Sequence, residues 1–473
     1  MKRYIFTFAL ALCFSAGLLA QPPGDSSPTY PQGATYVLSN GSTVTLDNQT
    51  FDCSTQYYNA VQVSNGTLYL NNCTYTKTGD GSSGDNSSFY GNNSTIYAGA
   101  ASSTNYESTT AGANAIIHIT GGTLTSNSQG ANAVFATNGA TIYVDGLTIV
   151  NNSSVSRGLH ATYNGTIIAT NVDITTNSQT SSTIATDRGG GTVIVTGGTA
   201  TAKGNRSAVL YSTGTITANN LTGLSELGEI ADVEGDNGVI INNCTMTSGS
   251  SERGLMMLQS GSGDAQGENA YITVSSSSLT TTDTNAPLCE VPTKNVGTLT
   301  LTDVTLNVAS GLLMFVDYNT QWTTHGGTGN LVLNTTQDSW TYQGNVDADS
   351  YSNITVTVGE NVVWQGVMDG DNDAMSSTVT VNQGGVWTLT GNAYVDVLVN
   401  NGTIHKGDYT LTYGSLSGNG TIDNQTGIDE NIEGNSVNDG KIYTLDGRCL
   451  GTTLPDNFQG VYIQNGKRHL KAR

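Results

Sequence analysis

Short runs of alternating apolar and polar residues follow one another along most of this chain. The run "TIYV" at 141–144 is followed by the pair Asp145-Gly146 and a second run, "LTIV", and the same arrangement returns from Thr166. Because successive side chains of a β-strand point to opposite faces, each run predicts a strand with one apolar face. A unit that returns at a fixed interval predicts a repeat architecture.

The interval between units is about two dozen residues. Successive units start 21 to 33 residues apart, and most intervals lie close to 25. The longer intervals contain polar insertions, such as residues 259–270. The first apolar residues of the units form the series Val44, Leu68, Ile96, Ile117, Ile142, Ile167, Val193, Ile216, Val239, Ile272, Leu299, Leu331, Ile354 and Val379.

A polar pair separates the two strands of each unit and predicts a sharp turn. The pairs are "NN" at 71–72, "DG" at 145–146, "TN" at 170–171, "GG" at 197–198, and "NN" at 219–220 and 242–243. Asn, Asp and Gly tolerate a left-handed backbone, so two residues suffice to turn the chain. If every unit turns at the same place, its strands lie parallel to those of the next unit, and residues one period apart become vertical neighbours.

This pattern resembles a right-handed, single-stranded parallel β-helix of the pectate-lyase-like kind, and the resemblance covers 35 to about 426. The predicted fold class is therefore all-β, a solenoid of roughly sixteen coils and about 75 Å length, with strands about 4.8 Å apart. A leucine-rich repeat has a similar period, but its LxxLxLxxN framework is missing, as is the hexapeptide of left-handed β-helices. Residues 353–426, with "GGVWTLTGNAYVDVLVNNGTI", resemble the C-terminal coils of autotransporter-type adhesin passengers.

Five segments are predicted along the chain. Residues 1–20 have the basic start, apolar stretch and small-residue end of a secretory signal peptide. A lead-in (21–34), the β-helix (35–426) and an acidic linker (427–440) follow. The last segment, 441–473, contains "IYTLDGR" and "GVYIQNGK" and resembles a short C-terminal sorting domain of the type IX secretion pathway. That resemblance implies export through secretion machinery to the cell surface or the medium.

The distribution of charged residues along the chain limits the kinds of partner that it can bind. Residues 21–440 contain eight Lys and Arg against 35 Asp and Glu, whereas 441–473 contain six basic and two acidic residues. A nucleic-acid partner is excluded, because phosphate binding needs clustered cations. No stretch of the mature chain is apolar enough to cross a membrane. Cys73 and Cys244 are predicted to be small core residues, since no Cys or His spacing indicates a metal.

One set of charged residues recurs with the period. Counting ten residues back from unit starts gives Arg157, Arg206 and Glu229, and Arg253 begins the next equivalent run, "SERGLMM". Arg206, Glu229 and Arg253 should therefore stack about 4.8 Å apart. The ladder is interpreted either as a register-fixing row of ion pairs or as a polar strip that contacts glycan.

Tryptophan recurs in the same way. Trp340, Trp364 and Trp387 are 24 and 23 residues apart. On the outside of the coils they would form a platform for sugar rings, and on the inside they would be core. Because Trp387 alternates with Leu389, the inward face is favoured.

Three alternate carboxylates, Asp369, Asp371 and Asp373 in "DGDNDA", resemble the opening of a calcium loop. The later Gly and bidentate Glu of such a loop are missing. Calcium is the only cofactor considered, and a solvated turn is the competing interpretation.

These features predict an exported, non-catalytic rod that is adhesin-like and contacts glycans or other surface macromolecules. A polysaccharide lyase or glycoside hydrolase is the first alternative, although the clustered Asp pairs, Gly-His-Gly and Arg-x-Lys of β-helix hydrolases are not found. A passive surface or matrix component is the second. A cleft with convergent carboxylates and a base would favour the enzyme, and exposed aromatics or long loops at 77–93, 259–270 and 317–329 would favour the binder.

Overall fold

The computed structural model is a parallel β-helix followed by a small separate unit. It describes residues 26–82, 84–259, 265–318, 325–424, 441–444, 449–454, 460–464 and 467–471. Ile142 pairs directly with Ile167 on adjacent parallel strands, which confirms the vertical stacking predicted from the period. The signal peptide, the whole linker (427–440), and the centres of the two insertions at 259–270 and 317–329 lie outside the described residues.

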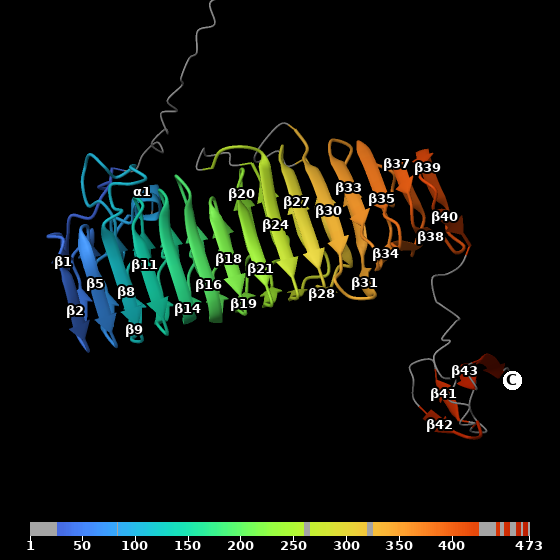
Figure 1. Cartoon of the computed structure of the whole chain (residues 1–473), viewed down its shortest axis with the longest axis horizontal. Helices are drawn as coiled ribbons and strands as arrows, with labels where there is room; N and C mark the ends of the chain where they lie inside the picture. The colour runs from blue at the N-terminus through green and yellow to red at the C-terminus, as the bar shows by residue number, and fades with distance from the viewer. Residues whose placement is uncertain are drawn as a thin grey trace, which may run out of the picture. The chain divides into compact units, whose positions relative to one another are not determined.

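The longest strip of the β-helix carries the predicted series of unit starts with one exception, Ile96, which lies in a different sheet. Leu68 pairs directly with Ile117, so the two intervals on either side of Ile96 belong to one long coil with insertions. Figure 1 shows its strands side by side in chain order. Within the described residues fifteen strands pair in succession, close to the expected number of coils. They are β2 (Thr43–Asp47), β5 (Gly66–Asn71), β8 (Ala115–Thr120), β11 (Thr141–Asp145), β14 (Gly165–Thr176), β16 (Gly191–Ala202), β18 (Thr215–Asn219), β21 (Gly238–Asn242), β24 (Asn269–Ser275), β27 (Val296–Thr302), β30 (Thr328–Asn334), β33 (Asn353–Val358), β35 (Ser376–Val381), β37 (Ala393–Asn400) and β39 (Leu411–Ser417).

A second strip follows the polar pairs. It comprises β3 (Thr50–Cys53), β6 (Thr74–Lys77), β9 (Thr123–Ser126), β12 (Thr148–Asn151), the distal halves of β14 and β16, β19 (Thr222–Ser225), β22 (Thr245–Ser248), β25 (Ser278–Thr281) and β28 (Thr305–Val308). The turn between the two strips has the predicted geometry, because Asn72, Asn171, Asn220 and Asn243 all have φ between 50° and 53°. Asn242 also donates to the Asn219 side chain one coil away, so the turns hydrogen-bond along the stack.

The third strip is a separate sheet that closes each coil. Its twelve strands are β1 (Gly33–Leu38), β4 (Tyr58–Val63), β7 (Ile96–Ala98), β10 (Val134–Ala136), β13 (Leu159–Ala161), β15 (Ile184–Thr186), β17 (Leu210–Ser212), β20 (Ala231–Glu234), β23 (Leu255–Leu258), β26 (Cys289–Val291), β29 (Leu312–Val316) and β32 (Asn345–Ala348). Aliphatic residues of all three strips meet inside the coils in one continuous core, which includes Cys73 and Cys244 as predicted.

The last coils are smaller and use only two strips. The second is a five-stranded sheet of β31 (Trp340–Gln343), β34 (Val362–Gly366), β36 (Val386–Leu389), β38 (Thr403–His405) and β40 (Thr421–Asp423). This change of coil falls on the segment whose sequence differs in character from the earlier repeats.

One insertion covers part of the twelve-stranded sheet from outside. It contains the only helix among the described residues, α1 (Asp85–Tyr90). Phe89 and Tyr90 of α1 pack with Tyr163, and the Arg188 guanidinium lies 4.2 Å from the centre of the Phe89 ring. We call residues 84–95, which include α1, and residues 99–114 the cover; they flank β7 of the sheet.

The chain divides into two compact units, Met1–Asp423 and Asn424–Arg473. In the second unit, β42 (Cys449–Gly451), β41 (Ile442–Thr444), β43 (Gly460–Gln464) and β44 (Lys467–Lys471) form an antiparallel sheet in that order. The β-helix therefore ends close to the boundary predicted at 426. Among the described residues, no helix has the length and apolarity that crossing a membrane requires.

Candidate functional site

The outward-facing row of the twelve-stranded sheet changes from apolar to acidic along the rod. Pairing places these residues in register: Gln62, Tyr97, Phe135, His160, Ala185, Tyr211, Asp232, Met256, Glu290, Phe315 and Asp347. The row from Tyr97 to Ala185 is at most 1% exposed, because α1 and its neighbours lie over it. From Tyr211 onward, the outer face of the sheet opens.

A pocket of about 660 Å³ lies at this transition, beside the end of the cover. Tyr211, Asp232 and Met256 belong to its floor strands β17, β20 and β23. The rest of the lining comes from five neighbouring coils and mainly from their turns, and most of these residues are polar. They are Arg157, Thr180, Ser182, Asn205, Arg206, Ala208, Leu227, Glu229, Glu234, Ser250, Ser251, Glu252, Arg253 and Leu258.

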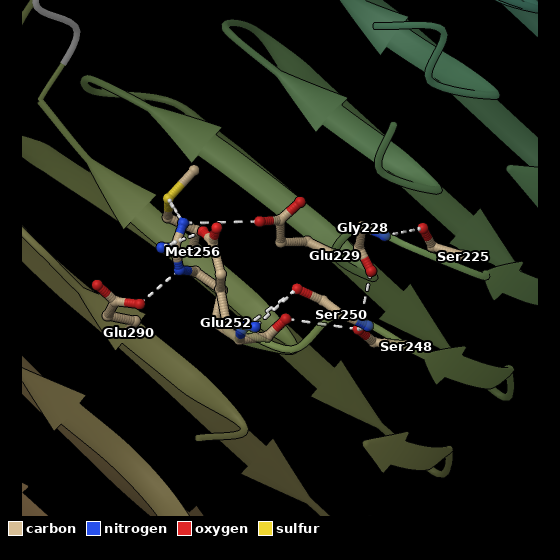
Figure 2. A network of polar contacts seen from close by, with 9 residues as sticks. Ser225, Gly228, Glu229, Ser248, Ser250, Glu252, Met256 and Glu290 are labelled. Atoms are coloured by element: carbon tan, nitrogen blue, oxygen red, sulfur yellow. Dashed lines mark hydrogen bonds and ion pairs between the residues drawn. The ribbon is translucent and has the colours of Figure 1, made fainter. Parts of the chain in front are cut away.

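Arg253 is the centre of a charged network, and Figure 2 labels its carboxylate partners Glu229, Glu252 and Glu290. Its guanidinium forms ion pairs with Glu229 at 3.6 Å and Glu252 at 2.7 Å, and its Nε binds the Glu290 carboxylate. Arg253 NH1 also contacts the Met256 sulfur at 3.1 Å. Burial opposes its charge, but the surrounding Glu carboxylates outweigh burial and raise the pKa of Arg253.

A short run of serines holds the turns that carry this network. The Ser225 hydroxyl accepts from Gly228 N at 2.9 Å, and the Ser248 hydroxyl donates to Gly228 O at 2.8 Å. Ser250 then accepts from the backbone of Glu252 at 3.2 Å. These hydrogen bonds join the turns of neighbouring coils and so fix the backbone positions of Glu229 and Arg253 relative to each other.

Asp232 lies on the pocket floor and is the least compensated of its carboxylates. Its Oδ1 is buried and accepts no hydrogen bond from any residue that the structure describes. Burial raises the pKa of Asp232 well above its usual range, and the charges of Glu234 and Glu229 raise it further. Burial also raises the pKa of Glu229, although Arg253 opposes the shift. The pocket thus holds carboxyl groups that retain a proton at higher pH than exposed ones.

Arg157 joins the cover to the pocket. Its guanidinium pairs with Asp187 at 3.3 Å, donates to the Ser88 hydroxyl in α1, and lies 5.4 Å from the centre of the Tyr211 ring. The side chain is only 8% exposed, yet its Nε makes no hydrogen bond within the described part of the chain. The Tyr211 hydroxyl donates to Glu234 at 2.9 Å, so a side-chain hydrogen bond also joins two strands of the pocket floor, β17 and β20.

The predicted charge ladder is correct at three positions and wrong at one. Arg157, Glu229 and Arg253 occupy equivalent positions, two residues before the paired strand residues Leu159, Ala231 and Leu255. At the Arg206 level this position belongs to Ala208, because Leu210 is the paired residue there. From Leu159 to Ile167 is eight positions, but from Leu210 to Ile216 is only six, so counting ten back overshoots by two.

Arg206 still reaches the pocket, but from its rim. It is exposed, has φ of 54° in a turn, and forms no ion pair with any described residue. Of the predicted stack of Arg206, Glu229 and Arg253, the contact between Glu229 and Arg253 is therefore present and that between Arg206 and Glu229 is not formed.

The predicted tryptophan ladder is core rather than a sugar platform. Trp364 and Trp387 are fully buried and stack with centroids 4.9 Å apart. Tyr342, not Trp340, pairs with Trp364 in this column. Trp340 is half-buried elsewhere, and its indole NH donates to Val304 O at 3.3 Å.

The acidic loop places two of its three carboxylates together. Oxygens of Asp369 and Asp371 lie within 4.8 Å of one another and of Asp347, whereas Asp373 is not part of this group. The Asp369 carboxylate is buried and accepts from the backbone of Asp373 at 2.9 Å, which is the role of a turn residue. Calcium binding at this group stays a prediction.

The pattern of unit starts missed Tyr211, Asp232, Glu234 and Glu290. Their signal was the third strand of these coils, which is only three or four residues long from β17 to β26 and was not separated from the turns around it. In "IADVEG" the carboxylates at 232 and 234 alternate with apolar residues, which is the strand pattern on a small scale. Comparisons of the chain with protein-family models, with curated proteins and with solved structures found no match.

Proposed function

We propose that this chain is an exported surface or secreted protein that binds glycan chains in the pocket over β17, β20 and β23. The observation that carries the proposal is the pocket itself. Its volume is that of a small-ligand site, and buried polar atoms in its wall lack partners. Sugars are dense in hydroxyl groups that both donate and accept, so they can satisfy such atoms.

The shape of the surroundings also favours a chain-like ligand. The pocket opens on the outer face of a long parallel sheet, and the acidic row continues from it through Glu290 to Asp347. The cover closes the other end of the row. A bound polymer would therefore lie along the open part of the row, with one unit in the pocket.

The proposed setting is extracellular and adhesin-like. The signal-peptide pattern at 1–20 and the sorting-domain resemblance at 441–473 support export, and the acidic surface supports a partner other than nucleic acid. Calcium that bound Asp347, Asp369 and Asp371 would lie on the same row and could add to the contact surface.

A rim substitution tests glycan binding in the pocket. Ser251 is an exposed lining residue, so Ser251→Trp should narrow the entrance without disturbing the core. On a glycan array, we expect the mature protein to bind one glycan class and Ser251→Trp to bind it at least about tenfold more weakly. Ser39→Trp, at an exposed turn before β2, is the matched control and should bind normally. Equal binding by both variants would move the glycan contact away from the pocket.

A second candidate function is cleavage of the bound polysaccharide. It is favoured by Asp232, whose raised pKa suits proton donation, with Glu229 and Arg253 beside it. The assay is the appearance of new reducing ends or unsaturated ends on any glycan that the array identifies. Asp232→Asn should abolish such activity. If the polymer stays intact after long incubation with the unaltered chain, cleavage is ruled out and only binding remains as the proposed function.

A further inference from the structure

The pocket contains more carboxylates than its cations can neutralise. Four carboxylates line it, and Glu290 contacts the same network from the next coil. Arg253 is shared among Glu229, Glu252 and Glu290. Arg157 is already paired with Asp187, and Arg206 lies exposed at the rim. Asp232 forms no ion pair with a described residue, so a negative group on the floor is left without a cation.

Two buried atoms of opposite kind mark the place for a ligand. The Asp232 Oδ1 is an acceptor and the Arg157 Nε is a donor, and neither has a partner in the described chain. Both residues line the pocket. Arg157 is more than nine-tenths buried, so water reaches its Nε poorly. A ligand that satisfies both atoms must present a donor to Asp232 and an acceptor to Arg157.

We propose that the pocket recognises a protonated amino group on a sugar, so that the bound glycan is an amino-sugar polymer with free amines. The ammonium lies against Asp232 and Glu229, and a neighbouring hydroxyl or ring oxygen accepts from Arg157 Nε. Leu227, Met256 and Leu258 supply apolar surface for the carbon-bound face of the ring. This inference rests on the proposed glycan binding and names the class of glycan.

The electrostatics of the pocket favour this class over the two obvious competitors. A uronic-acid polymer would bring further carboxylates next to Asp232 and Glu229, where like charges already raise both pKa values. An N-acetylated sugar would offer a neutral amide, which would not neutralise the excess of carboxylates in the pocket. An ammonium instead favours the ionised form of Asp232, so binding should release a proton at any pH where Asp232 is still protonated in the free protein.

Binding should therefore depend on pH through Asp232 and the groups that face it. These are Tyr211 from β17, Glu234 on the same strand, Glu229 in the preceding turn and Arg253 on the next coil. Affinity for the amine should rise with pH as Asp232 ionises and fall again once the amine itself loses its proton. The N-acetylated form should show no such profile.

Calorimetric titration of the mature protein with three probes tests the inference. The probes are a glucosamine tetramer, its fully N-acetylated form and tetragalacturonate. We expect the amine form to bind at least about tenfold more tightly than the other two, with proton release seen as a dependence of the heat on the buffer. Asp232→Asn should lose at least about tenfold of the amine affinity and most of the proton release. The matched control Asp145→Asn, exposed on β11, should change neither.

The outcomes separate this inference from the proposed function. If the N-acetylated or galacturonate probe binds as tightly as the amine, recognition of the amine is wrong while glycan binding stands. If none of the three oligosaccharides binds, both proposals fail. The ranking of probes uses the unaltered chain, so the inference is tested even if Asp232→Asn does not fold.

Discussion

At the residue scale, stacking brings carboxylates of different coils close to one another on the outer face of the sheet. Asp317, just after β29, illustrates this. Burial raises its pKa to about 7, and the charges of Glu290 and Asp349 contribute to the shift. Burial likewise raises the pKa of Asp347 to about 6, with Asp371 as the next cause. Carboxylates that lie on different coils, and so are far apart in the sequence, therefore titrate as one coupled group.

The raised pKa of Asp317 predicts that the β-helix loses stability as the pH rises. A carboxyl that binds its proton more tightly in the folded state stabilises the fold below its unfolded pKa of about 4, and this contribution is lost as the pH rises to about 7. Asp317→Asn removes the titration, so its free energy of unfolding should fall less between pH 5 and pH 8, by about 1 kcal/mol after solvent screening. Thermal denaturation across this range measures the slope.

The control for this pH series is Asp52→Asn, an exposed carboxylate on β3 far along the chain from the acidic row. It should keep the slope of the unaltered protein. An Asp317→Asn protein with that same slope would show that Asp317 does not carry the pH dependence.

At the element scale, the sequence predicts the repeat well and the covering elements poorly. Period and alternation are local, so the pairing of Ile142 with Ile167 and the left-handed turn at Asn171 follow from them. The cover has no such period, because α1 is a single short helix in an insertion whose packing partner, Arg188, is about a hundred residues away. The misplacement of Arg206 has the same origin, since one turn shortened by two residues leaves no mark in the apolar pattern.

The packing of α1 on the outer row predicts that the cover depends on Phe89. This side chain is 3% exposed and contacts Arg188, so Phe89→Ala should cost about 3 kcal/mol of local stability. Amide exchange at β10 and β13, which lie in the covered half, should accelerate. Phe315→Ala is the matched control, because Phe315 occupies the same row beyond the cover and is only half-buried. Unchanged exchange in the Phe89→Ala protein would mean that α1 does not protect the row.

At the scale of the whole molecule, the β-helix is a solenoid in which each coil touches chiefly its two neighbours. The core runs unbroken from Leu38 to Ile404 and includes no residue of the second unit. The pocket is built from coils near the middle of the rod, between Arg157 and Leu258. Within the part of the chain that the structure describes, the core and the pocket lining are therefore made from residues of the first unit.

This independence predicts that a chain ending at Asp423 keeps the β-helix and its binding site. Its thermal unfolding temperature should lie within about 2 °C of the full mature chain, because no described residue after Asp423 belongs to the core of the first unit. Binding to the glycan identified on the array should be unchanged.

The two chains should differ in export, because the proposed sorting role belongs to residues 441–473. The shortened protein should stay within the cell envelope of the producing organism, and cell fractionation measures this. A shortened chain that unfolds at much lower temperature would show that the second unit supports the last coils, and one that is exported normally would remove the sorting role from 441–473.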